Sequence, residues 1–226
     1  MNTLRGVLLD IDGTLIDSND AHALAWVAAL AEQDIHVRRE DVRRLIGMGG
    51  DKLLPAISGV DAESELGERI AERRGELFRE RYLPGVTAFP ESRALLERMR
   101  ADDLTLVAAS SAKADELGPL LARAGAKGLL QGATSSDDAE RSKPDPDIVE
   151  EAIARSGHDP DELVMLGDTP YDVEAATRAG VPIIALRCGG WGDADLRGAA
   201  AIYDGPADLL ARYESSLFAL RRSPRG

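Results

Sequence analysis

The chain has 226 residues, of which 44% are hydrophobic and 30% charged, so it can bury a sizeable core as one large domain or two smaller ones. Its net charge of −13 disfavours a nucleic acid partner, which needs Lys and Arg patches, and its apolar runs are too short for a membrane-spanning helix. Cys188 is the only cysteine and cannot form an intrachain disulfide, which predicts a cytoplasmic protein.

The first predicted strand, residues 7–9, ends in two carboxylates separated by one residue. Asp10 and Asp12 can face the same volume, because alternate residues of a strand point the same way, and Gly13 then permits a turn. Two like charges this close are unfavourable unless a cation lies between them or one carries a proton. The pair fits either two solvated acids in a turn or a Mg²⁺ site with a nucleophile and a proton-transferring neighbour.

Residues 15–84 form a helical block. Potential helix caps at 17–20 precede apolar residues at helical spacing, and further helices are predicted for 40–46 and 61–82. Between these, residues 47–52 form a glycine-rich entry to another helix. We therefore predict a small all-helical domain at 15–84, inserted into a second domain made of residues 1–14 and 85–226.

From residue 85 onward, helices alternate with short apolar strands. The predicted helices cover 91–100, 115–124 and 147–155, and another follows Asp168 and stops near Gly180. The predicted strands cover 104–109, 163–166 and 183–186, with a weaker strand that starts at 129–130 and another at 199–203. This alternation predicts an α/β fold with a doubly wound parallel sheet. The ligand site of such a sheet lies beyond the carboxyl ends of its strands, and Asp10, Ser110 and Asp168 each directly follow a predicted strand.

These carboxylates suit the hydrolysis of a phosphate monoester. Asp10 is placed for in-line attack on phosphorus, which forms an aspartyl-phosphate. Asp12 can protonate the leaving oxygen and then take a proton from the attacking water. Asp168 adds a carboxylate oxygen for Mg²⁺, whereas Asp172 is better placed to orient the site than to bind the ion directly.

Two further residues can bind the phosphate group. The Ser110 hydroxyl and the N–H groups after it can bind phosphate oxygens, and Lys143 supplies a cation for the transferring group. Taken singly, Ser110 is also explained as a helix cap and Lys143 as a solvated loop lysine. Asp168 and Asp172 are likewise explained as acids at a helix start. Their combination in this order favours an active site.

The ordered motifs resemble those of the haloacid dehalogenase (HAD) superfamily of phosphohydrolases over nearly the whole chain. They read Asp10-Ile11-Asp12-Gly13-Thr14, then Ser110, then Lys143 within Ser-Lys-Pro-Asp-Pro, then Gly167-Asp168-Thr169-Pro170-Tyr171-Asp172. The resemblance implies a Rossmann-like core with a helical cap at 15–84, Asp10 as nucleophile and Asp12 as acid/base. It also implies Mg²⁺ held by Asp10, the backbone carbonyl of Asp12, and Asp168.

Substrate contacts are expected from the core and from the cap. The core residues are Thr14, Ser110, Ser111 and Lys143. In capped relatives a segment like 47–52 faces the active site, so Gly49 and Lys52 are expected to touch the non-reacting part of the substrate. A solvated surface lysine is the alternative for Lys52, and His22 either reaches the cleft or packs within its helix.

The leading hypothesis is a Mg²⁺-dependent phosphatase for a small phosphorylated metabolite, of the phosphoglycolate phosphatase and β-phosphoglucomutase-like group. A sugar phosphomutase such as β-phosphoglucomutase is similar in cap and motifs. Phosphonate-cleaving relatives and dehalogenases are disfavoured by the second acid, Asp12, and a non-catalytic phosphate-binding module by the intact set of reactive groups. The substrate stays open at this point, as does the choice between a monomer and a homodimer.

Overall fold

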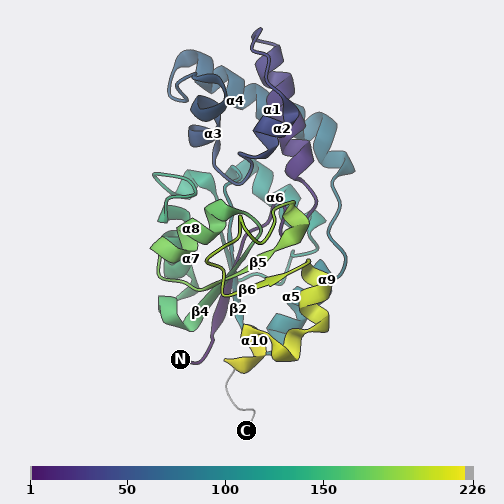
Figure 1. Cartoon of the computed structure of the whole chain (residues 1–226), viewed down its shortest axis with the longest axis vertical. Coiled ribbons are helices and arrows are strands. Elements are labelled where there is room, and N and C mark those ends of the chain that lie inside the picture. Colours follow the sequence, from purple (N-terminus) through teal and green to yellow (C-terminus); the bar gives the residue numbers. More distant parts are fainter. Residues whose placement is uncertain (1, 222–226) are drawn as a thin grey trace.

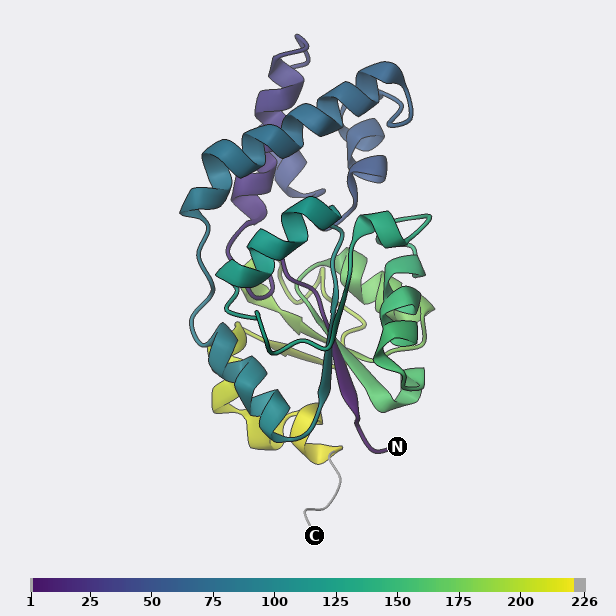
Figure 2. The same cartoon turned by 180° about the vertical axis from the view of Figure 1, so that it is seen from behind.

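The computed structural model describes residues 2–221 and places a layer of helices above a parallel sheet that is covered on both faces (Figures 1 and 2). The sheet has six parallel strands in the order β3-β2-β1-β4-β5-β6. Their bounds are β1 Gly6–Leu9, β2 Thr105–Ala109, β3 Gly132–Thr134, β4 Leu163–Gly167, β5 Ile183–Leu186 and β6 Ala201–Tyr203. The predicted α/β class with a doubly wound parallel sheet is confirmed.

Strand β1 lies at the centre of the sheet and carries the first motif to its carboxyl edge. Leu8 pairs with Val107 of β2 on one side and with Met165 of β4 on the other. All four residues of β1 are buried. This explains why the strand reads as a continuous apolar run, since helices cover both faces of the sheet.

The helices that flank the sheet divide between its two faces. Helices α5 (Ser92–Ala101), α6 (Ala114–Arg123), α9 (Pro206–Ala211) and α10 (Leu217–Leu220) contribute to one apolar cluster, with Val7 and Leu9 of β1. Helices α7 (Asp147–Ser156) and α8 (Pro170–Arg178) contribute to the other, with Leu8. The alternation of inward positions along β1 thus builds two cores, one on each side of the sheet.

Four helices form the upper layer, and they pack around Trp26, Leu30, Leu54 and Ile70. They are α1 (Asn19–Ala31), α2 (Arg39–Arg43), α3 (Gly50–Ser58) and α4 (Glu65–Leu77). The helix predicted for 61–82 is shorter at both ends, because α4 begins at Glu65 after the N-cap Ser64 and the last five residues, Phe78–Tyr82, form a π-helical turn. The division into a cap at 15–84 and a core stays a prediction.

The two chain segments that enter and leave this layer are hydrogen-bonded neighbours. Ile16 forms an antiparallel bridge with Ala88. The Asp17 N–H donates to the Thr87 carbonyl at 2.9 Å, and the Phe89 N–H donates to the Leu15 carbonyl at 3.0 Å. The helical layer therefore joins the sheet through one paired connection, which we call the hinge.

One predicted strand begins later than expected. Leu129 lies in a turn, in which Gly128 has a positive φ of 82° and the Leu129 N–H donates to the Ala126 carbonyl at 3.0 Å. The strand beside β2 begins only at Gly132. Two leucines suggested a strand, but the turn at Gly128 delays it.

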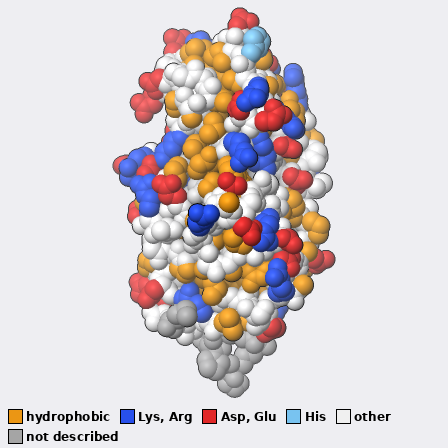
Figure 3. Space-filling view, in the orientation of Figure 1, with side chains coloured by type: hydrophobic (Ala, Val, Ile, Leu, Met, Phe, Trp, Pro, Cys, Tyr) orange, Lys and Arg blue, Asp and Glu red, His pale blue; other side chains and the backbone are white. Residues whose placement is uncertain are grey.

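The charged surface is mixed. On the face shown in Figure 3, Lys and Arg side chains are interspersed with Asp and Glu rather than gathered into one continuous patch. Within residues 2–221, every helix is too short or too polar to cross a bilayer.

Candidate active site

The carboxyl edge of the sheet brings together the acids and the lysine that the sequence singles out. Asp10 follows β1 and Asp168 follows the neighbouring strand β4. Lys143 enters from the loop before α7, is fully buried, and places Nζ 2.7 Å from Asp10 Oδ1 and 2.7 Å from Asp172 Oδ1. Residues separated by up to 162 positions (10 to 172) thus share one buried site.

A single hydroxyl links two of the carboxylates. Thr14 Oγ1 lies 2.9 Å from Asp10 Oδ2 and 2.9 Å from Asp168 Oδ1. One hydroxyl proton can satisfy only one of these oxygens at a time. Oxygen atoms of Asp10, Asp168 and Asp172 all lie within 4.8 Å of one another. This crowding of hard oxygen ligands suits a divalent cation.

The electrostatics of the cluster support the same conclusion. Burial raises the pKa of Asp10 to about 7, and the charges of Asp172 and Asp12 act in the same direction against the opposing charge of Lys143. Burial and the charges of Asp10 and Asp172 also raise the pKa of Asp168 well above its usual range. Although burial opposes its charge, the Lys143 ammonium has a raised pKa, because Asp10 and Asp172 stabilise it. One lysine therefore does not balance three acids.

Asp172 is held by the start of α8. Its Oδ2 accepts hydrogen bonds from Thr169 Oγ1 at 2.7 Å, from the Thr169 N–H at 3.0 Å and from the Asp168 N–H at 3.3 Å. Its Oδ1 faces Lys143. With both oxygens engaged, Asp172 holds Lys143 and the end of the strand in place, and its role in orienting the site stays a prediction.

Two glycines make room for Asp168. Gly13 adopts φ 79°, and a Cβ there would overlap both Asn19 Nδ2 and Asp168 Oδ2. A Cβ at Gly189 would also overlap Asp168 Oδ2. Asn19 Nδ2 donates to that oxygen at 3.1 Å, which fixes the carboxylate from the side of α1.

Asp12 points away from the cluster toward the helical layer. It accepts hydrogen bonds from Ser18 Oγ at 2.5 Å and lies 2.9 Å from His22 Nε2. Burial alone would raise the pKa of Asp12, but the contacts with His22 and Ser18 and the charge of Arg74 outweigh it and lower the pKa. His22, whose ring stacks on Phe78 at 3.9 Å, therefore reaches the site.

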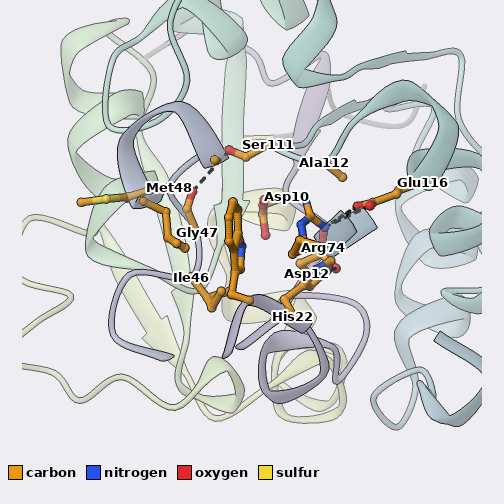
Figure 4. A pocket seen from close by; sticks show the side chains of 13 residues that line it. Asp10, Asp12, His22, Ile46, Gly47, Met48, Arg74, Ser111, Ala112 and Glu116 are labelled. Atoms are coloured by element: carbon orange, nitrogen blue, oxygen red, sulfur yellow. Dashed lines mark hydrogen bonds and ion pairs between the residues drawn. The ribbon is translucent and has the colours of Figure 1, made fainter. Parts of the chain in front are cut away.

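A small cavity of about 50 Å³ opens above these residues, and side chains from both layers line it (Figure 4). In this view Asp10 lies at the centre, Ser111 lies above it, and Asp12 lies below it beside His22. Arg74 of α4 lies beside Asp12, and its Nη1 donates hydrogen bonds to both carboxylate oxygens of Glu116 of α6 at 2.9 Å each. The reacting acids thus face a pocket completed by the helical layer.

The other predicted substrate contacts lie at different places. Thr14, Ser110 and Lys143 are fully buried beneath the cavity, and Ser110 Oγ accepts a hydrogen bond from the Ala112 N–H at 3.1 Å. Lys52 forms an ion pair with Asp145, in the loop that carries Lys143.

Gly49 packs against Ser142 in that same loop. From the segment 47–52, the cavity is lined by Gly47, Met48 and Gly50. Lys52 and Gly49 instead contact the core loop beside the cavity, and their contact with the substrate stays a prediction.

Sequence reasoning did not find Arg74 and Glu116. Arg74 stands in a long polar helix among several arginines, and Glu116 is an acid in the first turn of a helix, where the helix dipole already explains it. Burial was the missing signal, since Arg74 is 8% exposed and Glu116 is fully buried.

A parallel sheet with a buried lysine and carboxylates at its carboxyl edge, beneath a helical layer, defines an α/β enzyme of the HAD class. A sequence model of the haloacid dehalogenase-like hydrolases matches residues 7–186. The chain belongs to this family.

Individual relatives share most of its length. A phosphoglycolate phosphatase of Yersinia pestis is 30% identical over 191 residues, 82% of each chain. The pyrophosphatase PpaX of Bacillus velezensis is 30% identical over 178 residues, 78% of this chain and 80% of that protein. The crystal structure of a hydrolase from Pseudomonas syringae superposes with a TM-score of 0.87 at 30% identity, covering 93% of this chain and 98% of the other.

Proposed function

We propose that this protein is a Mg²⁺-dependent phosphatase that hydrolyses a small phosphate monoester through an aspartyl-phosphate on Asp10. The observation that carries this proposal is the position of Asp10, which lines the cavity while Lys143 holds its Oδ1 and Asp12 lies beside it. The relatives named as phosphoglycolate phosphatase and pyrophosphatase support phosphoryl chemistry. A cytoplasmic location stays a prediction.

Asp10, the backbone carbonyl of Asp12, and Asp168 would hold Mg²⁺. The fit rests on the shared Thr14 hydroxyl and on the excess negative charge that Lys143 leaves uncompensated. When bound, the ion would neutralise charge on the carboxylates and on the phosphate oxygens.

The residues of the chain divide the reaction into two displacements. Asp10 attacks phosphorus, so that a bond forms to its carboxylate oxygen while the bond to the leaving oxygen breaks and Asp12 protonates that oxygen. Asp12 then takes a proton from a water molecule that attacks the phosphoryl group and frees Asp10. The lowered pKa keeps Asp12 ionised before the substrate binds, and the negative charge of a bound phosphate favours the protonated form that the first step needs.

A panel of phosphorylated metabolites with Mg²⁺, in which free phosphate is measured, tests the proposal. Release of phosphate from at least one small monoester is the expected result. A sugar phosphomutase of the β-phosphoglucomutase kind would instead convert a hexose phosphate into its isomer, so the sugar product is analysed in the same reactions. Isomerisation without phosphate release would replace the phosphatase assignment by the mutase.

Removal of the metal is expected to stop turnover and to make stability depend on pH. Because the pKa of Asp10 is raised to about 7 in the folded protein, the folded state binds this proton more tightly than the unfolded chain. The resulting stabilisation is complete below about pH 4 and is lost as pH rises through about 7, a change of the order of 4 kcal/mol. Thermal unfolding with EDTA and with Mg²⁺ at pH 4 to 8 measures it.

The variant Asp10→Asn is the control for this pH dependence, because it lacks the titrating carboxyl group. With EDTA present, the stability of the wild type relative to the variant should fall with rising pH, and Mg²⁺ should restore the wild type at pH 8. A difference that does not change with pH, or turnover that survives thorough chelation, would contradict the metal site.

The substitution Gly189→Ala is expected to weaken Mg²⁺ binding and kcat/KM by at least about tenfold, because the added methyl group displaces the Asp168 carboxylate. Gly192→Ala is the matched control in the same loop, where the nearest atom to an added Cβ is Asp195 Oδ2 at 3.8 Å. Titration with Mg²⁺, followed by the thermal shift, compares the two. Equal Mg²⁺ affinity in both variants would contradict the proposal that Asp168 is a metal ligand.

A further inference from the structure

Asn19 is a buried amide of the helical layer that contacts the acids at the edge of the sheet. It is the first residue of α1, shortly after Asp17 of the hinge, and only 2% of its surface is exposed. Its Nδ2 donates hydrogen bonds to Asp168 Oδ2 at 3.1 Å and to the Gly189 carbonyl at 3.4 Å. The helical layer therefore reaches directly to Asp168, which we expect to bind the ion.

The stability of the fold does not explain an asparagine at this position. Both hydrogen bonds of its side chain go to residues outside α1, so the amide does not cap its own helix. Its Oδ1 is buried and has no hydrogen-bond partner among residues 2–221, which is unfavourable for the folded state. An apolar side chain would avoid this unfavourable burial but would leave Asp168 without its donor. The contacts of the amide thus indicate a role at Asp168.

The amide fixes the direction in which the Asp168 carboxylate is turned. Asp168 Oδ1 lies 2.9 Å from Thr14 Oγ1, the hydroxyl that also contacts Asp10 Oδ2. Asp168 Oδ2 faces Asn19 and packs so closely against Gly189 that an added Cβ there would overlap it. The last side-chain torsion of an aspartate has only weak preferences of its own, so its neighbours decide its orientation. With Oδ2 held, Oδ1 stays directed toward Asp10.

The peptide that packs against Asp168 is also held by the helical layer. The Gly189 carbonyl accepts a second hydrogen bond, from Nη2 of Arg43 at the end of α2. Arg43 in turn pairs at 3.2 Å with Asp20, the residue after Asn19. Two helices of the layer thus support the same peptide. If the layer moves away from the sheet, the supports of Gly189 and of Asp168 are lost together.

We propose that Asn19 is a positioning residue through which the helical layer sets the affinity of the site for Mg²⁺. The proposal rests on the phosphatase function proposed above, in which Asp168 is a metal ligand, and adds a dependence of the metal site on the position of the layer. Coupling between two equilibria is reciprocal. Mg²⁺ that binds best while Asn19 holds Asp168 must therefore also stabilise the contact between the layer and the sheet.

The first test measures Mg²⁺ binding by calorimetry in the absence of substrate. Asn19→Ala and Asn19→Ser should each raise the Kd for Mg²⁺ by about 10- to 100-fold, the usual effect of removing a group that orients a metal ligand. The concentration of Mg²⁺ that half-activates turnover should rise by the same factor. With EDTA, the Tm of both variants should stay within about 4 °C of the wild type, because the lost hydrogen bonds are offset by removal of the unpaired Oδ1.

Arg43 and Arg39 provide a matched pair of variants on α2. Arg43→Gln weakens the support of Gly189, so it should raise the Kd for Mg²⁺, and its effect should not multiply fully with that of Asn19→Ala because both act on the same peptide. Arg39→Gln is the control, since Arg39 pairs with Asp20 and Glu40 instead. Its Kd should stay within about twofold of the wild type.

The second test follows the contact between the layers by hydrogen exchange. The segment 44–50 of the layer docks on the sheet side, where the Arg44 carbonyl accepts from Tyr171 Oη at 2.7 Å and the Gly47 carbonyl from Ser111 Oγ at 3.3 Å. Saturating Mg²⁺ should slow amide exchange in this segment of the wild type by at least about threefold. In Asn19→Ala, compared at the same fractional saturation with Mg²⁺, most of this slowing should be lost.

The outcomes separate the role of Asn19 from the phosphatase function. An unchanged Kd for Mg²⁺ in both Asn19 variants, equal slowing of exchange in variant and wild type, or failure of both variants to fold would overturn the positioning role, while phosphate release by the wild type still supports the phosphatase. Mg²⁺ binding that depends on Asn19, without phosphate release from any ester, would support the positioning role and contradict the phosphatase. Absence of Mg²⁺ binding by the wild type would contradict both.

Discussion

The variant Asp10→Asn is expected to lower kcat for p-nitrophenyl phosphate by at least about 10⁴-fold while the protein stays folded. An amide cannot attack phosphorus as a carboxylate does, and removal of a nucleophile is among the most damaging changes to an enzyme. The fold should tolerate the change, because it removes one of the crowded charges around Asp168, and Lys143 keeps its contact with Asp172. Release of nitrophenolate and thermal unfolding measure the two effects.

Asp17→Asn is the matched control, since Asp17 belongs to the same segment of the chain but is exposed to solvent. Its turnover should stay within about twofold of the wild type, as surface substitutions usually change little. Wild-type turnover in Asp10→Asn would place the nucleophile elsewhere, and an unfolded Asp10→Asn would show that the carboxylate is needed for the fold itself.

The second large effect is expected from Lys143→Met. Removing one partner from a buried ion pair costs about 3–5 kcal/mol of stability, because the remaining charges are left uncompensated. Here Asp10 and Asp172 both lose the ammonium that lies 2.7 Å from each. Turnover should fall by at least about 10²-fold, since a cation near the transferring group is lost.

Added Mg²⁺ should restore part of the stability of Lys143→Met and little of its turnover, because an ion can offset the carboxylate charges but does not replace the ammonium. Lys127→Met, at an exposed lysine, is the control and should unfold within about 0.5 kcal/mol of the wild type. Urea unfolding with EDTA and with Mg²⁺ separates the contribution of Lys143 to stability from that of the bound ion. Equal stability of the two variants would mean that Lys143 is not needed to balance the acids.

Those site residues that directly follow a strand could be predicted from the sequence. Asp10 and Asp168 each follow a short apolar run, and parallel strands place such positions at a common edge. Lys143 was recognised through its place among the motifs, not through any local pattern, because a loop lysine is usually solvated. The structure shows why it differs, since two carboxylates compensate its complete burial.

Contacts between helices of different layers could not be predicted in this way. Arg74 and Glu116 are 42 residues apart and belong to α4 and α6, and nothing in either helix indicates the partner. The same holds for Lys52, which pairs with Asp145 in the loop of Lys143. Such pairs depend on how two layers approach each other, which periodicity and capping signals do not encode.

The hinge has a consequence for how such a protein can diversify. Because Ile16 and Ala88 are already bridged, the segment between them begins and ends at almost the same point in space. Its length and sequence can change without altering the register of β1 against β2 and β4, because its two ends stay paired with each other. New specificities can therefore be acquired by exchanging the part of this segment beyond His22, while Ser18, Asn19 and His22 keep their contacts with the acids at the edge of the sheet.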